Sequence, residues 1–249
     1  FFLLRDVQEK TGKNNTRYLD FVLGDNTGDI NGKIWSCREG AAAEFQKNSI
    51  VKVRGVVKSW NSQLQVNIER IREANDGDGV SIQNFIASAP ESPADMFDLV
   101  LQYIERIQNL QIKQLVAEIV RLRETKLRYF PAAKTNHHSV RGGLLYHITT
   151  MLRTADKIME IYDLNPDLLY AGIILHDIEK TSELDSNELG ITHDYTDEGK
   201  LLGHIIMGIK LVERVGAQLR TDPDIHLSIQ HMNYCHHYEP EYGSPLKPM

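Results

Sequence analysis

Hydrophobic and polar residues alternate with the two-residue period of a β-strand along much of the segment 1–73. In TRYLDFVLGD, for example, Leu19, Phe21 and Leu23 fall on one face and Asp20 on the other. A DNTG turn separates this strand from DINGKIW, and CREGAAAEFQKNS predicts a short helix or turn. Two further strands are predicted in SIVKVRGVVKSW and NSQLQVNIERI. Several short strands at this spacing predict a small barrel or sandwich.

From Pro93 onward the hydrophobic period changes to the 3.6 residues of an α-helix. MFDLVLQYIERI and IKQLVAEIVRLRE each place their apolar residues on one stripe. Four further helices are predicted in GGLLYHITTMLRTADKIMEIY, PDLLYAGIILHD, DEGKLLGHIIMGIKLVERV and DPDIHLSIQHMNYCHH. Residues 74–92 are rich in Gly, Ser, Asp and Pro, which is typical of a linker with a short docked segment. The sequence therefore predicts a β domain over 1–73, a linker over 74–92 and an all-α domain over 93–249.

Charge is distributed unevenly between these two parts. The net charge is −6, but residues 1–75 carry +3 and the remainder carries −9. A basic module joined to an acidic one hints at a polyanionic ligand for the first. The composition, 41% hydrophobic and 25% charged, is that of a soluble globular protein. The sequence contains no run of 18 apolar residues, so neither a transmembrane helix nor a membrane partner is predicted.

The N-terminus and the cysteines bear on location. FFLLRDVQEK lacks the basic lead and the small-residue cleavage site of a signal peptide, and without an initiator Met we expect a few residues to precede Phe1. Cys37 and Cys235 lie far apart and belong to no CxxC pair. Two free thiols in a reducing, cytoplasmic compartment are therefore predicted.

The histidines are confined to the second part of the chain. All ten lie after residue 136, at positions 137, 138, 147, 176, 193, 204, 226, 231, 236 and 237. A single histidine on an apolar stripe is more often a hydrogen-bonded core residue than a ligand. Here, however, each of the last four predicted helices carries at least one histidine on or beside its stripe, and Asp177 lies among them. Neutral imidazoles and a carboxylate that converge in a helical bundle are typical of a Mn, Fe, Co, Ni or Zn site.

His176 and Asp177 are neighbours at the end of the apolar run YAGIIL. Adjacent residues of a helix point about 100° apart, so this pair can converge only near a helix end or on two different ions. A carboxylate has two oxygens and can bridge two ions, whereas an imidazole cannot. Asp177 is therefore predicted to bridge a two-metal site with histidines on either side.

The pattern H147 … H176-D177 … H204 … H236-H237 resembles the HD superfamily of metal-dependent phosphohydrolases. More narrowly, NHHSVRGGLLYH, AGIILHDIEKT, YTDEGKLLGHI and HMNYCHHYEPEYGSPLKP resemble the YhaM-type 3′→5′ exoribonucleases over nearly the full chain. In that group an N-terminal OB-fold precedes an HD domain, which is the order predicted above. The expected fold is therefore a small OB-fold β-barrel followed by an all-α HD domain.

This resemblance implies a set of metal ligands and a reaction. The implied ligands are His147, His176, Asp177, His204, His236 and His237. Two divalent transition-metal ions are expected, with Mn first and Co, Fe, Ni or Zn as alternatives. The implied activity is hydrolysis of single-stranded RNA, with single-stranded DNA as a further candidate, to nucleoside 5′-monophosphates by a metal-activated water.

Two cations of the chain are candidates for contact with the substrate phosphate. Lys180, three residues beyond Asp177, could steady phosphate oxygens and is assigned to the catalytic set with Asp177. An ordinary surface lysine at a helix end is the alternative. Arg141, in SVRGGLL, is the second candidate.

The order of strands, turn and short helix over residues 2–73 resembles the OB-fold of tRNA anticodon-binding modules. OB-folds bind single strands on one barrel face, with aromatic side chains for stacking and basic ones for phosphates. The candidates here are Tyr18, Lys33, Trp35, Lys52, Arg54, Lys58 and Trp60. The alternative is that Trp35 is a core or rim aromatic and that the lysines form a solvated face.

The chain departs from the family pattern at two points. Glu179 stands where the family usually has glycine, and a carboxylate there either repels the substrate phosphate or points away to solvent. The family also takes a further aspartate ligand from a later helix, so we expect the domain to continue beyond Met249. Two other functions stay open: a phosphodiesterase or nucleotidase for a small nucleotide, and an RNA-binding protein with a degenerate metal site. Homo-oligomers are common among compact HD domains, but no interface is evident.

The remaining histidines receive separate expectations. His231 is predicted either as a ligand or as an imidazole packed in its helix. His137 and His138 are expected to face substrate or to be structural. His193 and His226 lie in polar sequence and are expected to be exposed.

Overall fold

The computed structural model describes residues 1–12, 15–61, 63–80, 82–134 and 139–237. The chain divides into two units, Phe1–Ala87 and Ser88–Met249, and the division falls inside the predicted linker. Each unit has its own buried apolar cluster. Within the described ranges, no helix is long and apolar enough to cross a membrane.

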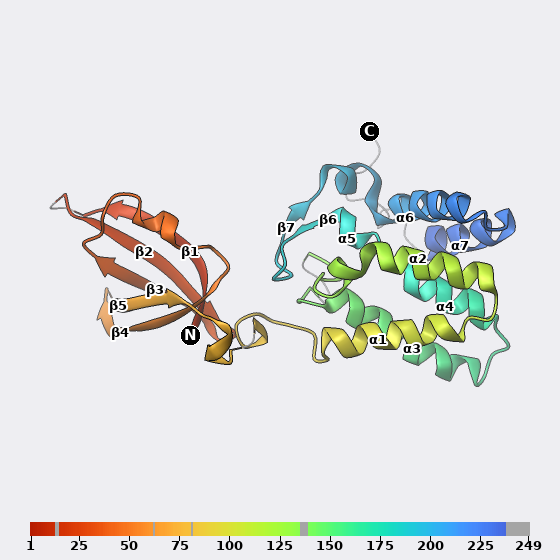
Figure 1. Cartoon of the computed structure of the whole chain (residues 1–249), viewed down its shortest axis with the longest axis horizontal. Coiled ribbons are helices and arrows are strands. Elements are labelled where there is room, and N and C mark those ends of the chain that lie inside the picture. Colours follow the sequence, from red (N-terminus) through yellow and green to blue (C-terminus); the bar gives the residue numbers. More distant parts are fainter. Residues whose placement is uncertain (13–14, 62, 81, 135–138, 238–249) are drawn as a thin grey trace. The chain divides into compact units, whose positions relative to one another are not determined.

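The first unit is a closed five-stranded barrel with the order β1-β2-β3-β5-β4 (Figure 1). Its strands are β1 (Phe2–Thr11), β2 (Arg17–Asp25), β3 (Gly28–Trp35), β4 (Ile50–Trp60) and β5 (Gln63–Glu73). A short 3-10 helix, η1 (Ala41–Glu44), follows β3 where a short helix or turn was predicted. Only β3 and β5 pair in parallel; the other neighbours are antiparallel. The prediction of an OB-fold barrel is confirmed.

The alternation along β2 decides which side chains enter the barrel. Leu19, Phe21 and Leu23 are buried, while Tyr18 and Asp20 lie on the outer face opposite residues of β3. A Cβ on Gly32 of β3 would come within 2.7 Å of the terminal methyl of Ile68, so the packed core would have to shift to accept a side chain there. The barrel core is therefore specified by the two-residue period together with one glycine.

The alternation in β4 is interrupted by an irregularity between Arg54 and Gly55. A Cβ at Gly55 would lie 2.3 Å from the backbone oxygen of Asn67, so only glycine permits this close pairing with β5. Beyond it Val56 and Val57 are both about half exposed. The far half of the β4–β5 hairpin therefore contributes surface rather than core.

Residues 74–92 hold two 3-10 turns, η2 (Asp76–Asp78) and η3 (Ile82–Asn84). Phe85 and Ile86 are buried, which agrees with the docked segment that the sequence predicts inside the linker.

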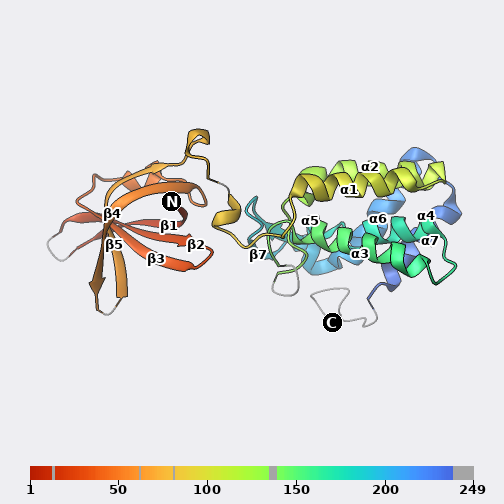
Figure 2. The same cartoon turned by 90° about the horizontal axis from the view of Figure 1, so that it is seen from below.

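The second unit contains seven helices in its described part (Figure 2). They are α1 (Pro93–Arg106), α2 (Leu110–Leu127), α3 (Gly143–Met159), α4 (Pro166–Leu175), α5 (Lys180–Glu183), α6 (Asp197–Leu219) and α7 (Pro223–Cys235). Five of the helices begin after a polar side chain that accepts a hydrogen bond from a first-turn backbone N–H. These N-caps are Ser92, Asn109, Asn165, Thr196 and Asp222.

Helix α4 is the centre of this unit. It contacts α1, α2, α3 and α7, and every residue from Tyr170 to Leu175 is buried. A helix that is apolar on all sides is buried in a protein core, which explains the apolar sequence that precedes His176. The end of α4 is thus held inside the bundle.

The second unit is not purely helical. A two-stranded antiparallel hairpin, β6 (Leu184–Ser186) and β7 (Thr192–Tyr195), lies between α5 and α6. The sequence did not predict it, because the strands are short and rich in polar residues. The HD-domain fold itself is confirmed.

Candidate metal centre

His176 and Asp177 lie directly after the last residue of α4. The backbone of His176 is still helical and its N–H donates to the Gly172 carbonyl. The chain then turns through Ile178 into α5, and both polar side chains are almost completely buried. The pair is therefore at a helix end, which is one of the two arrangements that the spacing allowed.

One oxygen of the Asp177 carboxylate faces two histidines from α3 and α4. Oδ2 lies 3.3 Å from His176 Nε2 and 3.7 Å from His147 Nε2. The two imidazole nitrogens are themselves 3.3 Å apart. We call His147, His176 and Asp177 Oδ2 the Oδ2 half-site.

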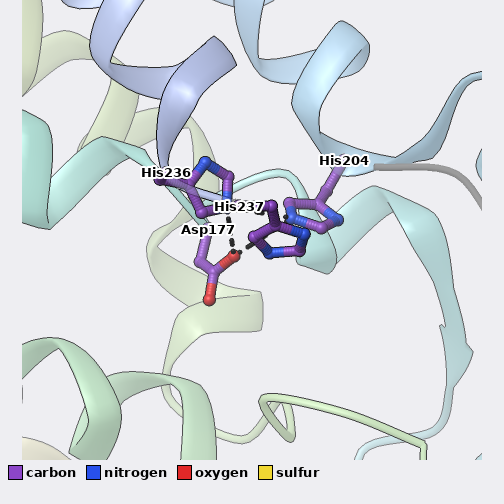
Figure 3. Close-up of side chains that lie close together, drawn as sticks. All are labelled: Asp177, His204, His236 and His237. Carbon is purple, nitrogen blue, oxygen red and sulfur yellow. Dashed lines mark hydrogen bonds and ion pairs between the residues drawn. The ribbon is translucent and has the colours of Figure 1, made fainter. Parts of the chain in front are cut away.

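The other oxygen faces histidines from α6 and the end of α7. Oδ1 lies 3.2 Å from His204 Nε2 and 3.6 Å from His236 Nε2. Figure 3 shows this carboxylate pointing at the imidazoles, with His237 beside them. We call Asp177 Oδ1, His204, His236 and His237 the Oδ1 half-site.

The chemistry of these donors fits two cations better than it fits a hydrogen-bonded core. Within each half-site the possible ligand atoms lie within 4.8 Å of one another. His204 Nε2 and His236 Nε2 are only 3.4 Å apart, and the buried Oδ1 has no hydrogen bond of good geometry. Converging nitrogen lone pairs around a shared carboxylate are the donor set of a transition-metal site. All six residues that the resemblance implied are brought together here; their role as ligands stays a prediction.

The outward nitrogens of three of these rings are fixed by hydrogen bonds. His176 Nδ1 donates to the Ile173 carbonyl at 2.8 Å, and His236 Nδ1 donates to the Asn233 carbonyl at 2.6 Å. His204 Nδ1 instead donates to the carboxylate of Glu183 at 3.0 Å. Because each acceptor is an oxygen, the proton resides on Nδ1 and the lone pair of Nε2 points into the site.

A break in α6 explains why His204 differs. Gly203 has φ 66° and ψ 162°, which interrupts the helix immediately before the histidine. The His204 backbone N–H is thereby released from the helical ladder and donates to Glu183 Oε1 at 3.0 Å. Glycine is suited to this position because it adopts positive φ without strain.

The charges of the site shift the pKa values of its members. Burial opposes ionisation of Asp177, but the surrounding imidazoles, His176 foremost, hold its pKa well below the usual range. Burial, aided by the neighbouring imidazoles, lowers the pKa of His237 to about 4. At neutral pH the carboxylate is therefore ionised and His237 neutral, the states in which both groups bind metals.

Known proteins match both units of this chain. Residues 4–74 match the OB-fold nucleic acid binding domain, and residues 144–248 match the HD domain. The chain is 36% identical over its whole length to the 3′-5′ exoribonuclease YhaM of Halalkalibacterium halodurans, of which it covers 77%. The proteins of the same name from Shouchella clausii and Bacillus subtilis are 37% and 34% identical over the whole chain, with 77% and 79% of their lengths covered. The chain belongs to the YhaM family. Its HD domain implies dependence on a divalent metal, and the residues clustered around Asp177 include enough potential donors to hold one.

Glu179, which stands where the YhaM family usually has glycine, forms an ion pair. Glu179 is 4% exposed, and Arg123 of α2 donates to its carboxylate at 2.6 Å. It therefore neither points to solvent nor stands as an uncompensated charge. The sequence offered repulsion of the substrate phosphate or exposure to solvent, and it missed the ion pair because Arg123 lies 56 residues away.

The two phosphate candidates are placed differently. Lys180 donates to Asp177 Oδ2 at 2.8 Å, so its ammonium lies at the shared carboxylate. Arg141 donates to the Glu188 carbonyl at 3.2 Å, and burial lowers its pKa. The role of Arg141 in contacting phosphate stays a prediction.

Three candidates of the OB-fold module form one cluster on β2 and β3, in which Trp35 is exposed, Tyr18 and Lys33 are half-buried, and Lys33 pairs with Asp20. The rings of Tyr18 and Trp35 lie 5.3 Å apart, and Lys33 Nζ lies 4.6 Å from the centre of the Tyr18 ring. Trp35 is 58% exposed and donates to Asn67 of β5. Trp35 is thus a surface aromatic rather than a core one, as stacking on a base requires.

The other candidates of the module lie on β4. Lys52 pairs with Asp78, and Arg54 pairs with Glu69. Lys58 and Trp60 are exposed on the half of the strand that contributes no core. Whether any of these residues contacts RNA stays a prediction.

The three other described histidines, His193, His226 and His231, lie outside the cluster. His193 is exposed, as expected, although it lies in β7 rather than in a loop. His226 is buried, so the expectation of exposure is wrong: its ring lies against Gly216 of α6, where a Cβ would be 2.2 Å from Nε2. His231 is exposed beside Cys235, with its Nδ1 3.6 Å from Sγ. His137, His138 and the segment after His237 lie outside the described residues.

Proposed function

We propose that this chain is a metal-dependent 3′→5′ exoribonuclease that hydrolyses single-stranded RNA to nucleoside 5′-monophosphates, with single-stranded DNA as a second substrate. The observation that carries the proposal is the Asp177 carboxylate, whose two oxygens face two separate groups of histidines. Membership of the YhaM family supports the reaction and its polarity.

The six clustered residues would hold two cations, with Asp177 shared between them. His147, His176 and Asp177 would hold one ion, and Asp177, His204, His236 and His237 the other. When bound, such ions supply a water of lowered pKa and neutralise charge that develops on the phosphodiester. Manganese is the first candidate metal and Co, Fe, Ni or Zn are alternatives, because imidazole and carboxylate donors accept several divalent ions.

The chain itself contributes a lysine ammonium beside Asp177 and largely buried side chains around the cluster. Lys180 presents an ammonium at Asp177, where it can pair with a phosphate oxygen of the substrate. The burial of His176, Asp177 and His204 restricts bulk water around the reacting groups. Both features favour attack by a metal-activated water on the bound phosphodiester.

The OB-fold module would hold the upstream single strand. The Tyr18, Lys33 and Trp35 cluster offers two π-faces and a cation, which is a sequence-tolerant way to bind nucleotides. A substrate of one nucleotide would not require such a platform. A cytoplasmic location and self-association stay predictions.

The test is a time course on a single-stranded RNA of about twenty nucleotides that carries a 5′ label, with Mn²⁺ or EDTA. We expect a metal-dependent ladder that shortens from the 3′ end and mononucleotide 5′-phosphates as products. A strand blocked by a 3′-terminal duplex is the control and should resist. Endonucleolytic fragments, or hydrolysis of free nucleotides only, would contradict the proposal.

A further inference from the structure

The two half-sites share Asp177 but differ in the charges that surround them. Beside the Oδ1 half-site lies Glu183, a carboxylate that is 5% exposed. At the Oδ2 half-site lies the ammonium of Lys180, 2.8 Å from Oδ2 itself. The sequence places both residues in α5, only three positions apart.

Glu183 is tied to His204 by two hydrogen bonds to the same oxygen. Oε1 accepts from the His204 backbone N–H and from Nδ1, each at 3.0 Å. Among the described residues, Glu183 forms its ion pair with His204. A carboxylate so placed fixes the ring and its tautomer and raises the basicity of Nε2.

The backbone around Glu183 is also held against α6. Its carbonyl accepts from the Thr196 N–H at 2.8 Å, and a Cβ at Gly199 would lie 2.3 Å from that carbonyl oxygen. The start of α6 and the end of α5 therefore meet without an intervening side chain. This close contact sets Glu183 opposite the break at Gly203, where His204 begins the second part of the helix.

At His176 and His236 the corresponding partners are neutral. His176 and His236 donate Nδ1 to backbone carbonyls of Ile173 and Asn233. A carbonyl orients the ring as well as a carboxylate does, but it adds no formal charge. Glu183 thus adds a negative charge to the Oδ1 half-site through His204, while Lys180 places a positive charge against the Oδ2 half-site.

We propose that Glu183 is a positioning residue for His204 and that it makes the Oδ1 half-site the tighter of two unequal cation sites, which therefore loads first. This inference rests on the proposed metal-dependent function. Its physical basis is attraction of the cation by the buried Glu183 charge, the more basic His204 Nε2, and repulsion between Lys180 and a cation at Oδ2.

The test is a titration of the metal-free full chain with Mn²⁺, in which the electron paramagnetic resonance signal of free Mn²⁺ reports the ions bound. Wild-type protein should bind two ions with dissociation constants at least about tenfold apart. Glu183→Gln should weaken the tight class by about 10- to 100-fold and leave the weak class within about twofold. Asp185→Asn is the matched control, because this exposed carboxylate lies two residues away and removes the same charge.

A second variant keeps the test decisive should Glu183→Gln fail to fold. His147→Ala removes a ligand of the Oδ2 half-site only, so one ion should remain bound with the affinity of the tight class. Two equivalent ions in the wild type, or loss of the tight ion in His147→Ala, would overturn the inference while the metal site stands. No bound Mn²⁺ in the wild type would overturn the proposed function itself.

Discussion

At the scale of single residues, the Arg123–Glu179 pair supports the turn that carries His176 and Asp177. The Glu179 side chain is 5% exposed and that of Arg123 is 20% exposed, so the carboxylate depends on the guanidinium far more than the reverse. Lys126 of the same helix donates to the Thr181 carbonyl at 2.7 Å. Helix α2 thus holds Glu179 and Thr181, two residues that follow closely after Asp177.

Arg123→Ala should lower the free energy of unfolding by about 3 kcal/mol, because it leaves a buried carboxylate unpaired. Glu179→Ala should cost only about 1 kcal/mol, since Arg123 can reach water. The double variant should resemble Glu179→Ala. Urea denaturation measures these values.

Arg121→Ala provides the control for that cycle. It breaks an exposed pair with Glu118 in the same helix and should cost less than about 0.5 kcal/mol. Strict additivity of Arg123→Ala and Glu179→Ala would show that the two side chains are not coupled.

How far sequence reasoning reached is clearest at the metal centre. Helical periodicity predicted that histidines of four helices converge near Asp177, and the family resemblance named the six residues that the structure brings together. The contact of Glu183 with His204 was missed because the polar sequence KTSEL is typical of a solvent-exposed helix end. Only the break at Gly203 brings His204 to it, and no local period encodes that contact. His226 was misjudged for a similar reason, since its burial depends on Gly216 in another helix.

At the scale of elements, the break inside α6 is the feature on which the Oδ1 half-site depends. Gly203→Ala should destabilise the protein by about 1–3 kcal/mol, because a side chain strains this backbone conformation. It should also weaken Mn²⁺ binding by displacing His204. Thermal unfolding and metal titration measure the two effects.

Leu201→Ala is the control in the same helix. Leu201 is 70% exposed, so its truncation should change stability by less than about 0.5 kcal/mol and leave metal binding unchanged. A Gly203→Ala variant with wild-type stability and affinity would show that the break is not required.

A second element-scale feature joins α1, α3 and α4. Asp156 of α3 accepts hydrogen bonds from Tyr103, Arg106 and Tyr170. The hydrogen bonds from Arg106, chiefly, lower the pKa of Asp156 to about 2. A carboxyl whose pKa is lower in the folded state stabilises the fold above its unfolded pKa of about 3.8, and this contribution is lost as the pH falls toward 2.

Asp156→Asn should therefore reduce the free energy of unfolding by about 1–2 kcal/mol at pH 7, a value that allows for the partial exposure of the side chain. The difference between variant and wild type should shrink at pH 3. Urea unfolding at both pH values measures it. A difference that grows on acidification would contradict the assignment.

At the scale of the whole molecule, the proposed division of labour assigns strand binding to the barrel and hydrolysis to the helical unit. Trp35→Ala should weaken binding of a single-stranded RNA by about tenfold in EDTA, since it removes one stacking surface. Fluorescence anisotropy measures the dissociation constant. Tyr162→Ala, which removes an exposed aromatic of the helical unit, should leave it unchanged.

The same variant distinguishes long substrates from short ones. Trp35→Ala should raise KM for a long RNA while the turnover of a dinucleotide stays at the wild-type value. Equal loss on both substrates would mean that Trp35 acts on the hydrolytic site or on stability rather than on the strand.

The measurement that tests the account most directly compares Asp177→Ala with Asp185→Asn in the 3′→5′ degradation of a labelled RNA with Mn²⁺. Asp177 supplies an oxygen to each half-site, whereas Asp185 is an exposed carboxylate nearby. We expect Asp177→Ala to lower the rate by at least about a thousandfold, with folding and RNA binding retained, and Asp185→Asn to match the wild type. A folded Asp177→Ala protein that still shortens RNA from its 3′ end at the wild-type rate would contradict the claim that this carboxylate organises the catalytic site.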